Sequence, residues 1–235
     1  MRFVAEYKMK DRSSIPIDYH NGFVSLIKSA VRSGSEEVFH DLFDKRVVKP
    51  YTYAVRFSNK PEIFDNMLSF EGPLKFFFSS ASRELGTRIY NGIVSLDKFV
   101  LYNIELQKPR VFLLPEPRIN NNTAIFQTLS PILIRHHQKN SWYVLPEEEG
   151  FEESVQRAFE EEWRNLYSEV VNCPKSKLLP LKVKKIVAKN YNASMFGFTG
   201  SIKVESSPEM LNLIQQAGFG QRRSQGFGML EAITV

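Results

Sequence analysis

Hydrophobic and polar positions in the first part of the chain follow two different periods. Residues 2–7 alternate between apolar and polar positions, which predicts a β-strand. The next apolar residues recur every three or four positions and predict one face of a helix: Phe23, Leu26, Ile27, Ala30 and Val31. Gly34 predicts the end of this helix, and Ser35 predicts the start of a second, short one. On the second helix His40 lies away from the apolar stripe, so we expect it to point away from the core.

The rest of the first half predicts strands on either side of one more helix. The segments are a strand at residues 49–57, a strand at 74–78, a helix from Ser79 or Ser80 to about Tyr90, and extended chain at 93–106. Together with the preceding strand and helices, they give the order β-α-β-β-α-β.

The second half begins after residues 115–122, whose prolines and asparagines predict a linker. The segments that follow are a strand within 124–135, a long helix that starts near Pro146, and paired strands at 181–190 and 194–205. The apolar face of the long helix is formed by Phe151, Val155, Ala158, Phe159, Leu166 and Val170. Glu147 to Glu149 are expected in its first turn. Glu162 falls on the apolar face, and the sequence does not explain it.

The last elements complete a second unit of the same order. Ser207, Pro208 and Glu209 have the properties of an N-cap, a first helical proline and a first-turn acid. The apolar stripe of this helix is Met210, Leu211, Ile214 and Ala217. Gly218 is suited to end it, and residues 227–235 predict a final strand. The chain is therefore expected to be an α+β protein with two tandem ferredoxin-like domains, residues 1–118 and 119–235.

Composition narrows the class of protein. The 235 residues are 43% hydrophobic and 24% charged, with no apolar run of about 18 residues that would span a membrane. No signal peptide is visible, and the single cysteine, Cys173, cannot form an internal disulfide, which favours a cytoplasmic location. The net charge of +5 favours a polyanionic partner such as RNA or DNA.

Residues 218–228 are the most distinctive stretch of the sequence. Four glycines, Gly218, Gly220, Gly226 and Gly228, surround the arginines Arg222 and Arg223. Glycine allows a backbone to approach a ligand closely, and successive N–H groups can hold a phosphate, so we expect a phosphate-binding loop outside both cores. A helix comes before this loop and a strand after it, which argues against the nucleotide-binding loops that follow a strand and open a helix.

The glycine spacing resembles that of a known RNA-cutting family. Gly-x-Gly, five residues and a second Gly-x-Gly near the end of a basic chain are similar to the glycine-rich loop of the CRISPR-associated family six endoribonucleases, which also have two ferredoxin-like domains. Members typically place a catalytic histidine shortly before a Lys-x-aromatic-Thr-Tyr strand, which His40 and residues 49–53 match. Lys28 stands where several relatives carry a tyrosine.

The resemblance implies cleavage of CRISPR repeat RNA without a metal or other cofactor. The 2′-hydroxyl would attack the adjacent phosphate and leave a 2′,3′-cyclic phosphate and a 5′-hydroxyl. This chemistry needs a base, an acid and a cation, for which we nominate His40 as base or acid and Lys49 as phosphate stabiliser. Lys28 is a third candidate and Tyr51 an alternative partner. His136 and His137 are expected on opposite faces of a strand, unable to share a metal.

The RNA-backbone surface is expected to combine the glycine loop, its arginines and a lysine-rich strand that carries Lys182, Lys184, Lys185 and Lys189. CRISPR repeat RNA is the expected partner, while a homodimer and binding to other CRISPR effector proteins stay open. Two other functions compete with the nuclease. One is a non-cleaving RNA-binding subunit of a CRISPR effector complex, and the other is a small metabolic enzyme with an apolar ligand pocket.

Overall fold

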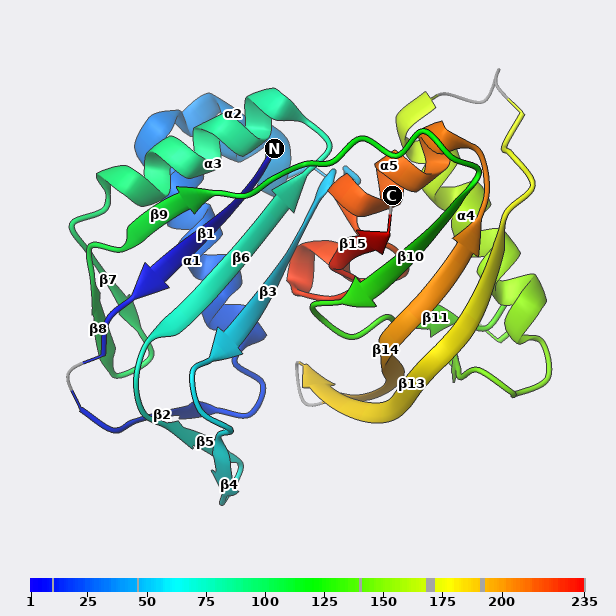
Figure 1. Cartoon of the computed structure of the whole chain (residues 1–235). Helices are drawn as coiled ribbons and strands as arrows, with labels where there is room; N and C mark the ends of the chain where they lie inside the picture. Colours follow the sequence, from blue (N-terminus) through cyan, green and yellow to red (C-terminus); the bar gives the residue numbers. More distant parts are fainter. Residues whose placement is uncertain (10, 46, 140, 168–171, 191–192, 235) are drawn as a thin grey trace.

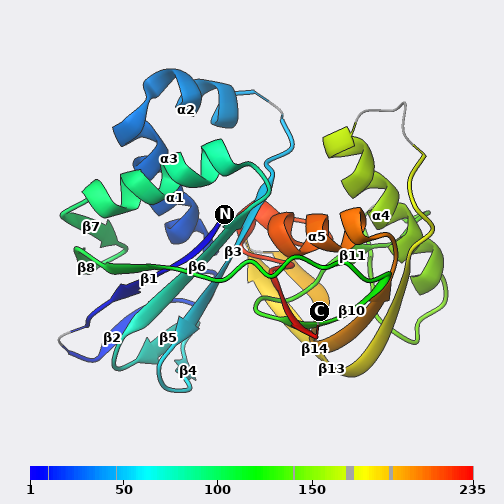
Figure 2. The same ribbon diagram turned by 45° about the horizontal axis from the view of Figure 1, so that its top comes forward.

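The computed structural model describes residues 1–9, 11–45, 47–139, 141–167, 172–190 and 193–234. It contains two four-stranded antiparallel sheets, one in each half of the chain (Figure 1). Helices cover one side of each sheet, and Figure 2 shows these helices on the same side of the molecule. No helix in the described ranges is both long enough and apolar enough to cross a membrane.

The first sheet has the strand order β3-β6-β1-β9. Its strands are β1 (Arg2–Tyr7), β3 (Tyr51–Phe57), β6 (Leu74–Ser80) and β9 (Arg110–Leu113). The helices of this half are α1 (His20–Gly34), α2 (Glu36–Phe43) and α3 (Arg83–Ser95). This half also contains two small sheets, one formed by β2 (Ser13–Pro16), β4 (Glu62–Phe64) and β5 (Met67–Phe70), and one by β7 (Lys98–Leu101) and β8 (Ile104–Gln107).

The second sheet has the order β13-β14-β10-β15, which repeats the spatial order of the first. Its strands are β10 (Thr123–Thr128), β13 (Lys177–Asn190), β14 (Ala193–Glu205) and β15 (Leu230–Thr234). The remaining elements are α4 (Phe151–Tyr167), α5 (Pro208–Ala217), the short turn η1 (Arg223–Gln225), and the pair β11 (Ile134–Arg135) and β12 (Tyr143–Val144). In both halves the third strand of the unit lies between the second and the first, so the predicted tandem ferredoxin-like fold is confirmed.

The boundaries of several elements differ from the sequence-based expectation. α3 begins after Ser82, whose hydroxyl accepts a hydrogen bond from the Leu85 amide at 3.2 Å, and not after Ser79 or Ser80. Ile93 is buried in this helix and is not part of an extended segment.

In the second half, α4 begins at Phe151, and the three glutamates expected in its first turn lie before the helix. The single strand expected within 124–135 is interrupted after Thr128. Val170, expected on the helix face, lies outside the described residues.

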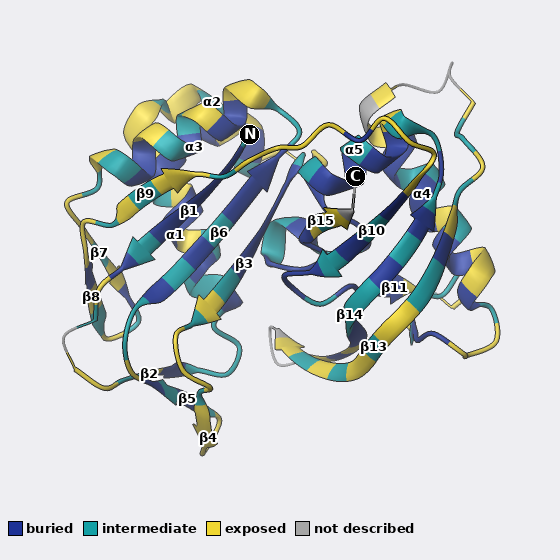
Figure 3. Cartoon of the chain, viewed as in Figure 1, coloured by how far each residue is buried: buried dark blue, intermediate teal, exposed yellow. Residues whose placement is uncertain are grey.

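Each half has its own main cluster of buried side chains. The last residue in sequence that packs in the first cluster is Val111. The first buried residue of the second cluster is Ile119. Figure 3 shows the buried central strands beside exposed β4 and much of β13. The division after residue 118 stays a prediction, but both units clearly have a core.

The two units also pack against each other through buried polar and apolar contacts. The Thr52 hydroxyl donates to the Phe227 carbonyl at 2.8 Å, and the Arg2 guanidinium donates to the Leu230 carbonyl at 2.8 Å. A small apolar cluster of Ala54, Leu129 and Met229 adds to this contact. The glycine-rich loop and the start of the last strand are therefore held directly against the first sheet.

Candidate functional site

The glycine-rich loop, residues 218–228, lies between the two units and not outside both cores, so that expectation is wrong. Phe219 and Phe227 are fully buried. The Phe219 ring lies 4.4 Å from Phe159 in the second core, and the Phe227 ring stacks on His20 of the first unit at 4.6 Å. The loop thus joins the units from inside, and only some of its polar side chains reach the surface.

The glycines of the loop are required by the protein's own backbone. All four have positive φ angles, from 70° at Gly228 to 92° at Gly226. A Cβ at Gly228 would lie 2.0 Å from the Phe219 carbonyl oxygen, and one at Gly226 would lie 2.6 Å from His20 Nδ1. These close approaches explain the glycine spacing without a bound phosphate, while RNA contact by the loop stays a prediction.

The two arginines of the loop have different environments. Arg223 is buried; it donates to the Ala217 carbonyl at 3.0 Å and pairs with the Glu162 carboxylate at 2.7 Å. Its expected place on an RNA-facing surface is therefore corrected. This ion pair explains why Glu162 lies on the apolar face of α4. Burial raises the pKa of Glu162 to about 7, although the charge of Arg223 opposes this shift.

Arg222 is only half-buried and has φ 58°. Its guanidinium donates to the Tyr143 hydroxyl at 3.0 Å and to the Gln225 side chain at 2.9 Å. No carboxylate among the described residues pairs with it, so its charge remains available to an anion.

His20 is a residue that the sequence analysis missed. It begins α1, and its ring lies 4.6 Å from both Tyr19 and Phe227. Burial lowers the pKa of His20 to about 4, although a hydrogen bond to the Gln225 backbone opposes this shift. A neutral imidazole therefore supports the loop. Nothing in the local sequence distinguishes this histidine, because the loop that buries it lies some 200 positions further along the chain.

His40 lies on α2 and is exposed, as its position on the helix predicted. Ser35 caps α2 by accepting a hydrogen bond from the Val38 amide at 3.3 Å. Phe39 is buried on the inner face of the helix, while the His40 side chain is 57% exposed. Its Nδ1 lies 2.5 Å from an Asp44 oxygen, and its Nε2 lies 3.6 Å from a Glu36 oxygen.

Lys28 and Lys49 come together beside the end of α2. Their ammonium groups lie 5.4 Å and 5.6 Å from the centre of the Phe43 ring. The pKa of Lys49 is lowered mainly by its partial burial and, to a smaller extent, by the charge of Lys28. Phe43 follows His40 by three positions on the helix, which places the two on neighbouring positions of its surface. Three of the residues nominated from the sequence therefore lie in one region.

Tyr51, the alternative partner, is separate from this region. It is fully buried, its ring lies 5.4 Å from Phe78, and burial raises the pKa of its hydroxyl far above the usual value. Tyr51 is a core residue of β3, so its nomination for proton transfer is corrected.

A pocket of about 300 Å³ connects the Lys49 region with the glycine loop. Its walls come from three places: the segment that leads into β3, the last turns of α4, and the exposed side of the loop. The lining residues are Val47, Val48, Lys49, Glu161, Glu162, Asn165 and residues 220–224. Lys49 and Arg222 therefore share one pocket, although 173 positions separate them in the sequence.

The lysines of β13 are exposed but do not line this pocket. Lys182 and Lys184 face solvent, and the Lys185 ammonium lies 3.9 Å from Glu147. Lys189 donates to the Asn66 side chain at 2.9 Å, which joins β13 to the turn between β4 and β5. Their contribution to RNA binding stays a prediction.

The adjacent histidines His136 and His137 do not line the pocket beside Lys49. The rings of His136 and His137 stack at 4.7 Å, so the expectation that they face opposite ways is wrong. The described ranges contain no group of three His, Cys, Asp or Glu residues placed to hold a metal.

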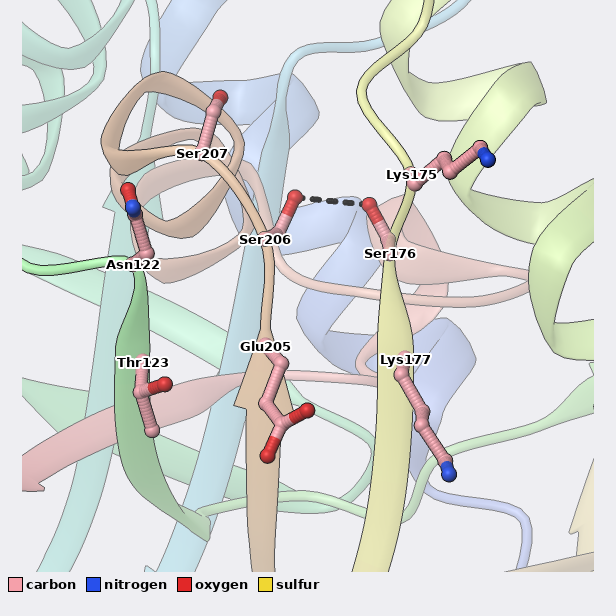
Figure 4. A pocket seen from close by; sticks show the side chains of 8 residues that line it. All are labelled: Asn122, Thr123, Lys175, Ser176, Lys177, Glu205, Ser206 and Ser207. Atoms are coloured by element: carbon pink, nitrogen blue, oxygen red, sulfur yellow. Dashed lines mark hydrogen bonds between the residues drawn. The ribbon is translucent and has the colours of Figure 1, made fainter.

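A larger depression, about 620 Å³, lies where α5 begins. The Ser176 and Ser206 hydroxyls lie 2.7 Å apart in it. Figure 4 shows this hydrogen bond, with Lys175 and Lys177 extending in different directions. It includes none of the nominated catalytic or loop residues.

Comparisons with known proteins agree with this architecture. The fold places the chain among proteins with two tandem ferredoxin-like units, and two solved structures share it over nearly the whole chain. One, described as the characterization of a Cas6-related gene from Pyrococcus furiosus, has TM-score 0.86 at 20% identity and covers 99% of this chain and 98% of its own. The other, described as an RAMP protein binding different RNA substrates, has TM-score 0.84 at 18% identity and covers both chains completely.

The family follows from the sequence comparison. The family model for the C-terminal part of the CRISPR-associated protein Cas6 matches residues 114–232. The CRISPR-associated endoribonuclease Cas6 of Pyrococcus furiosus is 22% identical over 239 aligned positions, which cover 98% of this chain and 89% of the relative. The chain belongs to the CRISPR-associated Cas6 family, as its glycine spacing predicted.

Proposed function

We propose that this protein is an endoribonuclease that cuts CRISPR precursor RNA within its repeats and so produces guide RNAs. The observation that carries the proposal is the exposed His40 on α2, three positions before Phe43, whose ring both Lys28 and Lys49 contact; Lys49 also lines the pocket beside the glycine loop. Similarity to relatives named as endoribonucleases supports it.

The proposed reaction is an internal transesterification. The 2′-oxygen of the nucleotide upstream of the cut forms a bond to phosphorus while the bond from phosphorus to the 5′-oxygen breaks. The 2′-hydroxyl gives its proton to a base, and the leaving 5′-oxygen takes one from an acid. The products are a 2′,3′-cyclic phosphate and a 5′-hydroxyl, and histidine and lysine suffice for these proton transfers without a metal.

His40 would act as the general base or the general acid. Asp44 engages Nδ1 at 2.5 Å, so Nε2 is the nitrogen we expect to exchange a proton with RNA. Lys49 would stabilise the charge that develops on the phosphate, and its lowered pKa also makes it a stronger acid than an ordinary lysine. Lys28, on the same aromatic ring, would add positive charge to this region.

RNA binding would also use charges on the second unit. Arg222 is the arginine of the glycine loop expected to contact phosphate, because Arg223 already has a buried carboxylate partner. Lys182, Lys184 and Lys185 offer further exposed charge on β13.

The direct test is to incubate the purified protein with its repeat RNA in EDTA and to identify the product ends. We expect cleavage with a 2′,3′-cyclic phosphate, and no cleavage when the upstream nucleotide is a deoxynucleotide. Cleavage that requires added magnesium would contradict the proposed chemistry. Tight binding without any cleavage would favour the non-cleaving RNA-binding subunit.

A further inference from the structure

We propose that the pocket between α4, the glycine loop and residues 47–49 holds one unpaired nucleobase next to the cut, and that Asn165 reads the edge of that base. This inference rests on the proposed function, because it places the scissile phosphate near Lys49. It adds a specificity-determining residue from α4, an element to which the sequence analysis assigned no chemistry.

The size and walls of the pocket suit a planar base. Its volume of about 300 Å³ is at the lower end of the range for small-molecule pockets. Val47 and Val48 line one side and remain 43% and 53% exposed, so their apolar surface is available to the face of a ring. Unpaired RNA bases are commonly recognised by a contact on the face together with hydrogen bonds along the edge.

The pocket also carries hydrogen-bonding groups without a protein partner. The Asn165 amide and the Ser224 hydroxyl make no hydrogen bond with any described residue, and both line the pocket. The Gln221 side-chain amide donates a hydrogen bond from its nitrogen to the Glu161 carboxylate at 3.1 Å, which leaves its oxygen as an acceptor. An asparagine amide offers both donors and an acceptor, which is what discrimination between bases requires.

The charges favour a base over a phosphate inside the pocket. Arg223 is already paired with Glu162 at 2.7 Å, and Glu161 adds a second carboxylate that Arg157 engages at 3.1 Å. Both acids already hold an arginine, so neither Arg157 nor Arg223 is free to bind a phosphate beside them. Lys49 and Arg222 have no carboxylate partner in the described ranges, so the phosphates on either side of the base would lie against them.

The test measures base preference on the full protein. Single-turnover kcat/KM is determined for repeat RNAs carrying each of the four bases at each nucleotide flanking the cut. We expect the natural protein to prefer one base at one position by about tenfold or more, the size of one good base contact. Asn165→Ala should reduce this ratio to about threefold or less, and Asn165→Asp should change which base is preferred, because a carboxylate only accepts hydrogen bonds.

The matched control is Asn103→Ala, an exposed asparagine between β7 and β8, far from α4 in Figure 1. It should keep the natural ratio. If the protein shows no preference at either position, or if both Asn165 variants keep the natural preference, the proposal is overturned.

RNA-affinity measurements distinguish a failure of this inference from a failure of the proposed catalysis. Affinities for deoxy-substituted, uncleavable RNAs with the same four bases should show the same preference and the same loss in Asn165→Ala. A preference that appears in binding while the natural protein never cuts would sink the proposed nuclease but leave the pocket. Cleavage that depends on His40 but keeps the natural base preference in both Asn165 variants would sink only the pocket.

Discussion

The glycine loop and the surface of α2 were both expected to face RNA, but in the structure the loop is largely buried and the surface of α2 is exposed. The phenylalanines of the loop and Arg223 are buried in the protein, whereas α2 leaves His40 exposed and carries Phe43, which two lysines contact. A glycine pattern of this kind indicates that the backbone lies close to other atoms. It does not indicate whether those atoms belong to the protein or to a ligand. Here the nearest atoms belong to the protein, so we expect changes in the loop to act first on stability and changes near α2 to act first on rate.

The largest expected loss of stability comes from Gly228→Val. Valine would be strained at φ 70°, and its Cβ would lie 2.0 Å from a carbonyl oxygen, so we expect a loss of about 3–6 kcal/mol. Thermal and denaturant melts measure it. Gly34→Ala is the control, because a Cβ at Gly34 would enter open space. A Gly228 variant that melts normally yet loses RNA would make the loop an RNA surface after all.

Glu162→Ala should cost nearly as much, about 3–5 kcal/mol, because it leaves the Arg223 guanidinium buried without its carboxylate. Denaturant melts of Glu162→Ala and of Glu153→Ala would compare a buried and an exposed glutamate of α4. Equal, small losses would mean that the ion pair does not hold the loop.

His20 makes the contact between the loop and the first unit sensitive to acid. Its pKa is lowered from 6.5 to about 4 in the folded protein, so the unfolded chain binds more protons between these values. Stability from this group is present above pH 6.5 and is lost as the pH falls through 4, by about 3 kcal/mol in all. His20→Phe should remove this part of the acid dependence in melts between pH 7 and 4. An unchanged pH dependence would show that His20 is not held neutral.

The smallest expected effect is a change in the salt dependence of RNA binding, which should distinguish Arg222 from Arg223. Arg222→Ala should flatten the dependence of log affinity on log salt by up to about 0.7, the share of one single-strand phosphate. Arg223→Ala should leave that slope unchanged and lower the melting temperature. Salt-titrated binding of both variants decides between them, and equal changes of slope would remove the distinction.

Most of the fold could be predicted because its signals are local. The serine caps at Ser35 and Ser207 and the apolar stripes of the helices depend on neighbours within a few positions, and the structure has both caps. The repeated strand order then follows from the repeated sequence of elements.

The site could be predicted only in part, because its remaining features depend on distant contacts. His40 could be placed on the outer face from the helical period alone. The burial of Arg223 depends on Glu162, 61 positions earlier, and that of His20 depends on Phe227. Glu162 on an apolar face was the one available signal, since a buried acid usually has a partner.

Under the proposed function, His40 transfers a proton in RNA cleavage. The most direct measurement is the single-turnover cleavage rate of His40→Ala in EDTA, with RNA affinity measured on the same sample and His136→Ala as the matched histidine control. We expect a loss of about 10²–10⁴-fold in rate with little change in affinity, and a nearly natural rate for the control. A His40→Ala protein that binds and cleaves repeat RNA at the natural rate would contradict it.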